Sequence, residues 1–211
     1  MTIRVGVLGS SDIAKRRMIP ALIKHSVLEY AGVAIADYDE WENNEFTKEE
    51  YSEILNAKKK KASELVSLYR GDLYIGYETL LKDNSIDAVY IPLPPAFHFK
   101  WAKRALEYGK HVLLEKPFTT NQNDAKVLIS LANKKNLAIV ENYGFIYHSQ
   151  FELIKNTYYD GKIGDLRLIR ACFGFPHRSD SDFRYSKKYG GGNQNMLLLI
   201  LNHQFFHHKK Y

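Results

Sequence analysis

The chain has 211 residues, of which 45% are apolar and 26% are charged. This length allows one domain, or one domain and part of a second, and the composition excludes disordered and collagen-like proteins. No apolar run approaches the roughly 18–20 residues of a membrane span, and the first residues lack the segments of a signal peptide. One cysteine, Cys172, excludes an internal disulfide and is typical of a reducing compartment. We therefore expect a cytoplasmic protein with no membrane partner.

The net charge of +6 is local. Four positive charges form the run Lys58–Lys61, and two more are Lys209 and Lys210. Without these six the formal charge is zero. A lysine run in a helical stretch is typical of a solvated helix face, so we expect no nucleic-acid partner.

Apolar runs alternate with helical patterns along the first 140 residues. Short apolar runs predict strands at 3–8, 30–36, 88–91, 112–114 and 137–140. Helices are predicted at 13–25, 47–69, 97–108 and 121–135, with Pro20 a kink, Gly109 a C-cap and Asn121 an N-cap. This alternation predicts an α/β fold with a doubly wound parallel sheet. Such sheets bind ligands at the carboxyl ends of their strands.

The pattern changes after about residue 158. Residues 166–175 predict one long strand of an open-faced sheet, and the glycine run Gly190–Gly192 follows. We therefore expect a nucleotide-binding domain at 1–145, the start of an incomplete second α/β domain at 146–192, and an atypical tail at 193–211. His203, His207 and His208 of the tail lack an accompanying carboxylate, and no metal site is expected.

The first predicted strand ends in the turn Gly9-Ser10-Ser11-Asp12-Ile13-Ala14. Dinucleotide-binding Rossmann folds need a tight turn there, a close backbone approach to the pyrophosphate, and a small residue where helix meets strand. Gly9 and Ala14 fill the first and third positions, and Ser11 takes the place of the second glycine. We expect Gly9, Ser11, Asp12, Ile13 and Ala14 to bind the cofactor, with helix N–H groups facing the phosphate. A plain strand–turn–helix is the alternative.

Asp37 follows the second predicted strand. A carboxylate at this place can accept hydrogen bonds from both ribose hydroxyls of NAD and would repel a 2′-phosphate. The sequence therefore predicts NAD(H) in preference to NADP(H), with Tyr38 beside the adenine. An ordinary helix-capping aspartate is the alternative reading, and Asp39 competes for the role.

Polar and proline residues also follow the other strands. Pro92, Leu93 and Pro94, with His98, follow the third, and Glu115-Lys116-Pro117 follows the fourth. A lysine at a strand end can hydrogen-bond a substrate hydroxyl or carbonyl, although a surface lysine is an equal alternative. His98 can instead be a cap or a core residue. Glu141 and Tyr143 follow the fifth strand, at the same edge.

Together these motifs resemble the glucose–fructose oxidoreductase / inositol dehydrogenase (Gfo/Idh/MocA) family. The turn 9–14, the segment 89–94 with His98, and Glu115–Pro117 carry the resemblance. It extends over residues 141–143, His148, Arg184 and the glycine run, and covers residues 3–192. The stretch 11–21 is most similar to members that reduce keto-sugars attached to nucleotides.

The resemblance implies a nicotinamide-dependent oxidoreductase with an N-terminal Rossmann domain and a C-terminal domain for substrate and oligomer contacts. Lys116 would be the active-site lysine, and Asp37 would match the acidic position of NAD-preferring members. Pro92, Leu93, Pro94, His98, Glu115, Lys116, Pro117 and Glu141 would bind the cofactor, and Lys116, Tyr143 and Arg184 would contact the substrate. The reaction would move a hydride between nicotinamide and a sugar or nucleotide-sugar carbonyl or hydroxyl.

The end of the chain departs from the family. Members have an aspartate after the glycines and a histidine or tyrosine four residues later, where this sequence has Met196 and Ile200. Members also run to roughly 300 residues or more, as two domains require. A frameshift explains the departure, and a short paralogue with its own tail is the alternative. We therefore expect impaired turnover, with a non-catalytic NAD-binding regulatory module or a non-functional fragment as the other readings. The family forms homo-oligomers through a sheet mostly absent here, which leaves homo-oligomerisation in doubt.

Overall fold

The structure is a computed structural model that describes residues 2–40, 47–168, 170, 172, 174, 176 and 182–190. The chain divides into two compact units, Met1–Glu141 and Asn142–Tyr211, here called unit 1 and unit 2. Among the described residues, no helix combines the length and the apolar character that crossing a membrane requires.

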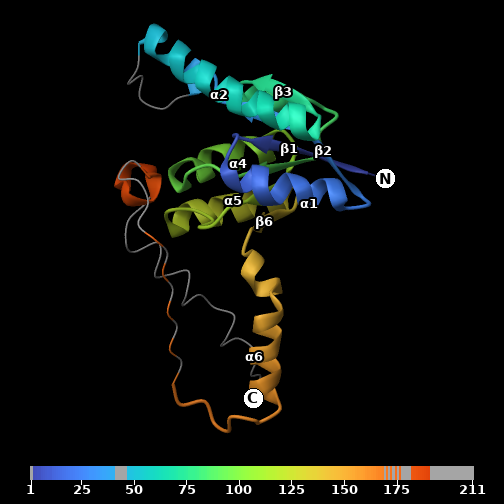
Figure 1. Ribbon diagram of the computed structural model, residues 1–211, viewed down its shortest axis with the longest axis vertical. Helices are drawn as coiled ribbons and strands as arrows, with labels where there is room; N and C mark the ends of the chain where they lie inside the picture. The colour runs from blue at the N-terminus through green and yellow to red at the C-terminus, as the bar shows by residue number, and fades with distance from the viewer. Residues whose placement is uncertain are drawn as a thin grey trace. The chain divides into compact units, whose positions relative to one another are not determined.

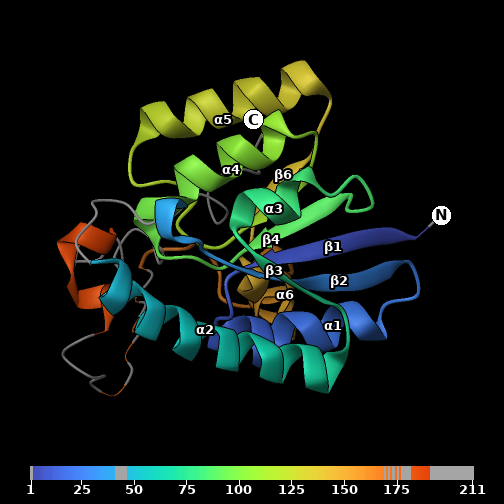
Figure 2. The ribbon, with the colours of Figure 1, turned by 90° about the horizontal axis from the view of Figure 1, so that it is seen from above.

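Unit 1 is built on a parallel sheet (Figures 1 and 2). The strand order is β3-β2-β1-β4-β5-β6, the order of a Rossmann fold. The strands are β1 (Ile3–Leu8), β2 (Leu28–Ile35), β3 (Asp72–Ile75), β4 (Ala88–Ile91), β5 (His111–Leu114) and β6 (Ile139–Glu141). The chain order reverses between β1 and β4, and ligands of such sheets bind beyond the carboxyl ends at this switch point.

Helices cover both faces of the sheet, as Figure 2 shows. One face carries the π-helical turn η1 (Ala14–Met18), α1 (Ile19–Lys24) and α2 (Lys48–Tyr69). The other carries α3 (Tyr77–Lys82), α4 (His98–Glu107) and α5 (Gln122–Lys135). Short 3₁₀ turns, η2 (Tyr38–Glu40) and η3 (Pro95–Phe97), lie between strands and helices.

The ends of these helices follow from local sequence. Thr47 and Glu50 form a capping box at the start of α2, in which each side chain accepts a hydrogen bond from the other residue's backbone N–H. The predicted N-cap Asn121 is confirmed, since its side chain accepts a hydrogen bond from the Asp124 N–H. Gly109, with φ +76°, follows α4 as predicted. The predicted helix 13–25 contains a π-helical part ahead of Pro20, which has no N–H to continue an α-helical ladder.

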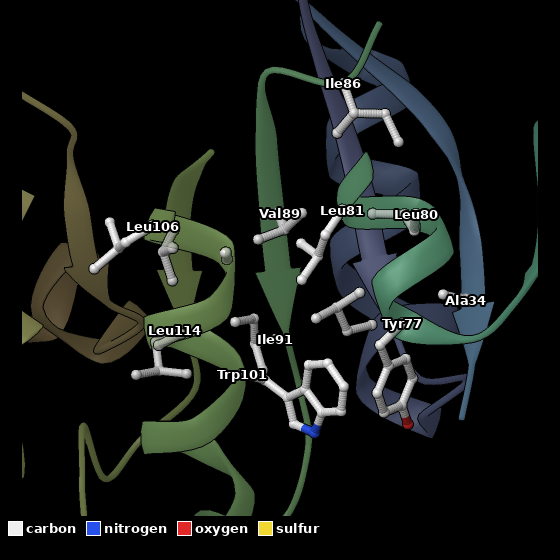
Figure 3. Packing of buried hydrophobic residues seen from close by; sticks show 14 of the residues in the cluster. Ala34, Tyr77, Leu80, Leu81, Ile86, Val89, Ile91, Trp101, Leu106 and Leu114 are labelled. Carbon is white, nitrogen blue, oxygen red and sulfur yellow. The ribbon is translucent and has the colours of Figure 1, made fainter. Parts of the chain in front are cut away.

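Buried side chains pack on both faces of the sheet. Successive residues of β4 alternate, since Val89 and Ile91 belong to the cluster under α3, α4 and α5 whereas Tyr90 belongs to the cluster under α1 and α2. Figure 3 shows the first cluster. In it the Tyr77 and Trp101 rings pack edge to face, with their ring centroids 4.8 Å apart. Burial on both faces explains why the strands read as continuous apolar runs.

Strand β3 was absent from the sequence prediction. It has four residues, it lies at the edge of the sheet, and none of its side chains is fully buried. Its apolar signal is therefore weak, and its pairing with β2 over Gly32–Ile35 determines its structure.

Unit 2 consists, in its described part, of η4 (Gly144–Tyr147), α6 (Ser149–Tyr159), η5 (Phe183–Tyr185) and η6 (Lys187–Tyr189). Of the strand predicted at 166–175, the described residues have no strand assignment and are exposed: Leu166–Leu168, Arg170, Cys172 and Gly174. The other four positions lie outside the described residues. A strand needs a partner for its backbone groups, and the described part of unit 2 contains no other strand. The predictions for residues 193–211 lie outside the described residues.

Candidate cofactor and active site

The carboxyl ends of the strands gather the predicted site residues of unit 1 at one edge of the sheet. Leu8 is in register with Ala34, Val7 with Tyr90, and Ile91 with Leu114, which in turn pairs with Glu141. The turns after β1, β2, β4, β5 and β6 therefore begin at similar heights. The structure thus brings the motifs that follow β1, β2, β4 and β5 to the same edge as Glu141, the last residue of β6.

The turn after β1 has the backbone of a dinucleotide-binding loop. Gly9 has φ +99° and donates its N–H to Ala34 O at 2.8 Å, and a Cβ on Gly9 would lie 2.9 Å from Leu93 Cδ2. Ser11 Oγ accepts the Ala14 N–H at 3.2 Å. Ala14 is fully buried against the sheet, whereas Asp12 and Ile13 are exposed. A glycine at position 9 and a buried alanine at position 14 are the features that a dinucleotide-binding turn requires.

The acidic turn after β2 is held by its own hydrogen bonds. Asp37 is exposed, its Oδ1 accepts the Tyr38 N–H at 2.7 Å, and its own N–H donates to Glu40 Oε2 at 2.9 Å. Tyr38 packs edge to face against Tyr51, with ring centroids 5.2 Å apart. Tyr38 is thus held in place at the edge where the adenosine half of a dinucleotide would lie.

Glu40 is a structural residue of this edge that the sequence reasoning missed. Its carboxylate accepts the backbone N–H groups of Tyr77 at 2.7 Å and Glu78 at 2.8 Å, the first two residues of α3. It therefore caps a helix that lies 37 residues further along the chain. Gly76, directly before α3, has no side chain that could cap the helix. A helix start without its own capping residue was the one sequence signal that a distant residue provides the cap.

His98 lies beneath two loops of the site. Its side chain is fully buried, with Nε2 2.8 Å from Leu93 O and Nδ1 2.7 Å from Pro117 O. Burial lowers the pKa of His98. Both ring nitrogens face backbone carbonyls, so neither is left to bind a cofactor. His98 is therefore a core residue, which was one of the alternatives for this histidine.

The segment after β5 presents Lys116 between fixed neighbours. Glu115 Oε1 accepts the Tyr90 hydroxyl at 2.7 Å, and Phe118 donates its N–H to Glu141 Oε1 at 2.6 Å. Lys116 is exposed, and the Lys116–Pro117 peptide is cis. Burial raises the pKa of Glu141, and the nearby Glu115 adds to this. A cationic side chain thus stands at the strand edge among hydrogen-bonded carboxylates.

Tyr143 and Arg184, the other predicted substrate residues, belong to unit 2. Arg184 Nη1 pairs with both carboxylate oxygens of Asp182, at 2.9 and 3.0 Å, and its guanidinium lies 4.4 Å from the centre of the Phe183 ring. The approach of these two residues to Lys116 stays a prediction. Among the described residues, no group of three or more His, Cys, Asp or Glu side chains could hold a metal ion.

A family model described as "Oxidoreductase family, NAD-binding Rossmann fold" (GFO_IDH_MocA) matches residues 3–143. The chain belongs to this family. The resemblance stated from the motifs is confirmed, as is the Rossmann fold.

Relatives of this Gfo/Idh/MocA chain include sugar reductases. A dTDP-3,4-didehydro-2,6-dideoxy-alpha-D-glucose 3-reductase from Saccharopolyspora spinosa is 39% identical over 190 residues, which are 90% of this chain and 51% of the relative. The crystal structure of KijD10, a 3-ketoreductase from Actinomadura kijaniata in complex with NADP and TDP-benzene, is 35% identical with a TM-score of 0.77, covering 91% of this chain and 53% of that chain. The chain thus spans about half the length of the relatives it matches.

The predicted preference for NAD(H) over NADP(H) is corrected by these relatives. KijD10 was crystallised with NADP. The prediction rested on Asp37 alone, and one oxygen of that carboxylate accepts the Tyr38 N–H and closes the turn after β2. Capping the turn accounts for an aspartate at this position, so its place after the strand does not decide between the two dinucleotides.

Proposed function

We propose that this protein binds NADP(H) at the edge of the unit 1 sheet and reduces the keto group of a nucleotide-linked sugar. The observation that carries the proposal is Lys116. It stands exposed at the end of β5, on the same edge as the Gly9 turn. Its neighbours on both sides are fixed by Tyr90, Glu141 and His98.

The cofactor would supply the hydride that reduces the carbonyl carbon. The chain's own contribution begins with the turn 9–14, whose glycine and exposed helix start leave room for the pyrophosphate. Lys116 would donate a hydrogen bond to the carbonyl oxygen, and the developing negative charge on that oxygen would be stabilised by the ammonium group. Lys116 would then give a proton to this oxygen, which completes the hydroxyl of the product, and the neutral amine would take a proton back from solvent.

The substrate class rests on the relatives. The reductase from Saccharopolyspora spinosa acts, by its name, on a dTDP-linked deoxysugar, and KijD10 was crystallised with TDP-benzene. Because these relatives are about twice as long as the matched region, both the substrate and the turnover of this chain are part of the proposal.

The test measures binding and turnover separately. The purified chain is titrated with NADPH by calorimetry, and NADPH oxidation is then followed by absorbance with a dTDP-linked 3-keto-deoxysugar. We expect saturable NADPH binding and substrate-dependent oxidation. Absence of NADPH binding would contradict the cofactor proposal. Binding without oxidation across a panel of dTDP-linked keto-sugars would refute the reductase and leave a nucleotide-binding module.

A further inference from the structure

His98 connects two loops whose relative position matters for the candidate site. It is the first residue of α4, and it is one of two buried polar or charged side chains among the described residues; the other is Lys110. Nε2 faces Leu93 O in the loop after β4, and Nδ1 faces Pro117 O in the loop after β5. Because both acceptors are carbonyl oxygens, the neutral ring donates through one nitrogen and the protonated ring through both.

A row of contacts runs from the dinucleotide turn to Lys116 through this imidazole. Gly9 has Leu93 so close that a Cβ would come within 2.9 Å of Cδ2. Leu93 O contacts His98, and His98 contacts the carbonyl of Pro117, the residue after Lys116. A displacement of the turn would therefore reach the lysine through short contacts, two of which are the hydrogen bonds at His98.

The other hydrogen bonds around Lys116 connect its segment to different parts of the fold than the His98 contact does. Glu115 is held by Tyr90 of β4, and Phe118 is held by Glu141 of β6. Both bonds tie the segment to neighbouring strands. The two hydrogen bonds of His98 tie this segment to the Leu93 loop.

We propose that His98 is a positioning residue that couples the loop covering the dinucleotide turn to the loop carrying Lys116. This inference rests on the proposed function for its purpose, but the coupling itself is a property of the folded chain. Loss of the imidazole would let Lys116 move relative to the carboxylates of Glu115 and Glu141. Both Glu115 and Lys116 are near enough to Glu141 to affect its pKa, since the charge of Glu115 raises it and that of Lys116 lowers it.

The test reads the position of Lys116 through its titration. Lysines of the full chain are reductively methylated with ¹³C, the Lys116 signal is assigned with Lys116→Arg, and its pKa is measured by NMR. We expect His98→Leu to shift the pKa of Lys116 by about half a unit or more, because the distances from the ammonium to its charged neighbours change. His98→Gln, which keeps a side-chain N–H donor, is expected to restore part of the wild-type titration.

Lys110→Met is the matched control. Lys110 is 4% exposed and donates to two backbone carbonyls, Asp83 O and Ile86 O, both at 2.7 Å, beyond the other end of α4. Its loss is expected to destabilise the fold while the Lys116 titration stays as in the wild type. Coincident Lys116 curves for wild type and His98→Leu would overturn the proposal, as would an equal shift in Lys110→Met.

An NADPH titration of the same samples separates the two proposals. If the wild type binds NADPH, the Lys116 signal is expected to move on binding, and to move less than half as far in His98→Leu. If the wild type does not bind NADPH, the proposed function fails, whereas the role of His98 is still decided by the titration without cofactor. Should His98→Leu not fold, His98→Gln is compared with Lys110→Met by the same criterion.

Discussion

Lys116 combines an exposed side chain with neighbours that hydrogen bonds hold in place. Its side chain is exposed, yet hydrogen bonds hold Glu115, Pro117 and Phe118 around it. A surface lysine with mobile neighbours would lose more conformational entropy on meeting a substrate. At the residue scale, the candidate site therefore depends on the hydrogen bonds at Glu115, Pro117 and Phe118 as much as on Lys116 itself.

Replacing Lys116 tests its chemical role. Lys116→Met is expected to lower kcat by about 10²- to 10⁴-fold, the contribution of a positioned acid, while the Kd for NADPH changes little. Lys126→Met, at an exposed position on α5, is the control and is expected to behave as wild type. Steady-state kinetics and an NADPH titration measure both. A kcat for Lys116→Met near that of the control would rule out the assigned role.

Asp83 illustrates a residue whose ionisation stabilises the fold. Its carboxylate accepts the Ser85 N–H at 2.8 Å and the Tyr74 hydroxyl at 2.8 Å. Hydrogen bonds from Ser85, then from Tyr74, lower the pKa of Asp83 to about 2. Because the folded state holds the proton less tightly than the unfolded state, this stabilisation is complete above about pH 4 and is lost as the pH falls toward 2.

The Asp83 pKa gives a direct measurement. An NMR titration of the side-chain carboxyl is expected to give a midpoint near the pKa of about 2. Asp83→Asn is expected to lower the free energy of unfolding at pH 7 and to flatten its decline between about pH 4 and 2. Asp165→Asn, at a side chain that is 91% exposed, should keep the decline. A normal pKa for Asp83 would contradict the hydrogen-bond arrangement.

At the scale of elements, the connections after the strands form the candidate site, and the paired strands bring these connections to one edge of the sheet. The turn after β1 meets the loop after β4 through Gly9 and Leu93, and the loop after β4 meets the loop after β5 through His98. Glu40 joins the turn after β2 to the start of α3 in the same way. Each connection therefore depends on an element distant in sequence.

A comparison of Gly9 with Gly109 distinguishes the cost of a positive φ from the cost of a steric clash. Gly9 and Gly109 both have positive φ, +99° and +76°, but only a Cβ on Gly9 meets a neighbour, since that on Gly109 has nothing within 4 Å. Gly109→Ala is expected to cost about 1 kcal/mol from strain alone. Gly9→Ala should cost more and should also weaken NADPH binding by displacing Leu93. Denaturant unfolding and NADPH titration measure both, and equal effects of the two variants would contradict the close contact.

At the scale of the whole molecule, the buried core belongs to unit 1. Every member of the two core clusters lies between Val5 and Ile139. No residue of unit 2 whose exposure the structure describes is buried, and Leu153 and Tyr159 of α6 are more than 60% exposed. Because buried apolar area supplies most of the stability of a domain, unit 1 should fold without unit 2.

A shortened chain of residues 1–143 tests this independence. It is expected to unfold in one cooperative transition, with a Tm within about 4 °C of that of the main transition of the full chain. Circular dichroism during heating gives both values. A shortened chain without a cooperative transition would show that unit 2 stabilises the Rossmann unit.

The sequence alone was sufficient for the alternation of strands and helices, for the family, and for the edge of the sheet that carries the candidate site. These follow from local signals: apolar runs, caps such as Asn121, and motifs such as Glu115-Lys116-Pro117. The sequence was insufficient for the short edge strand β3, for the cap that Glu40 places on α3, and for the burial of His98 between two carbonyls. Each depends on residues that meet only when the chain folds.

The same physical difference explains one wrong prediction, the cofactor preference, and one strand that the described residues do not show. Alternation at 166–175 predicted a strand, but a strand also needs a partner, and the described residues of unit 2 provide none. Asp37 predicted NAD(H) by its place after β2, but only the folded turn shows its carboxylate accepting the Tyr38 N–H. Sequence patterns determine which local structure a segment favours, whereas long-range hydrogen bonds and burial decide what each side chain is free to do.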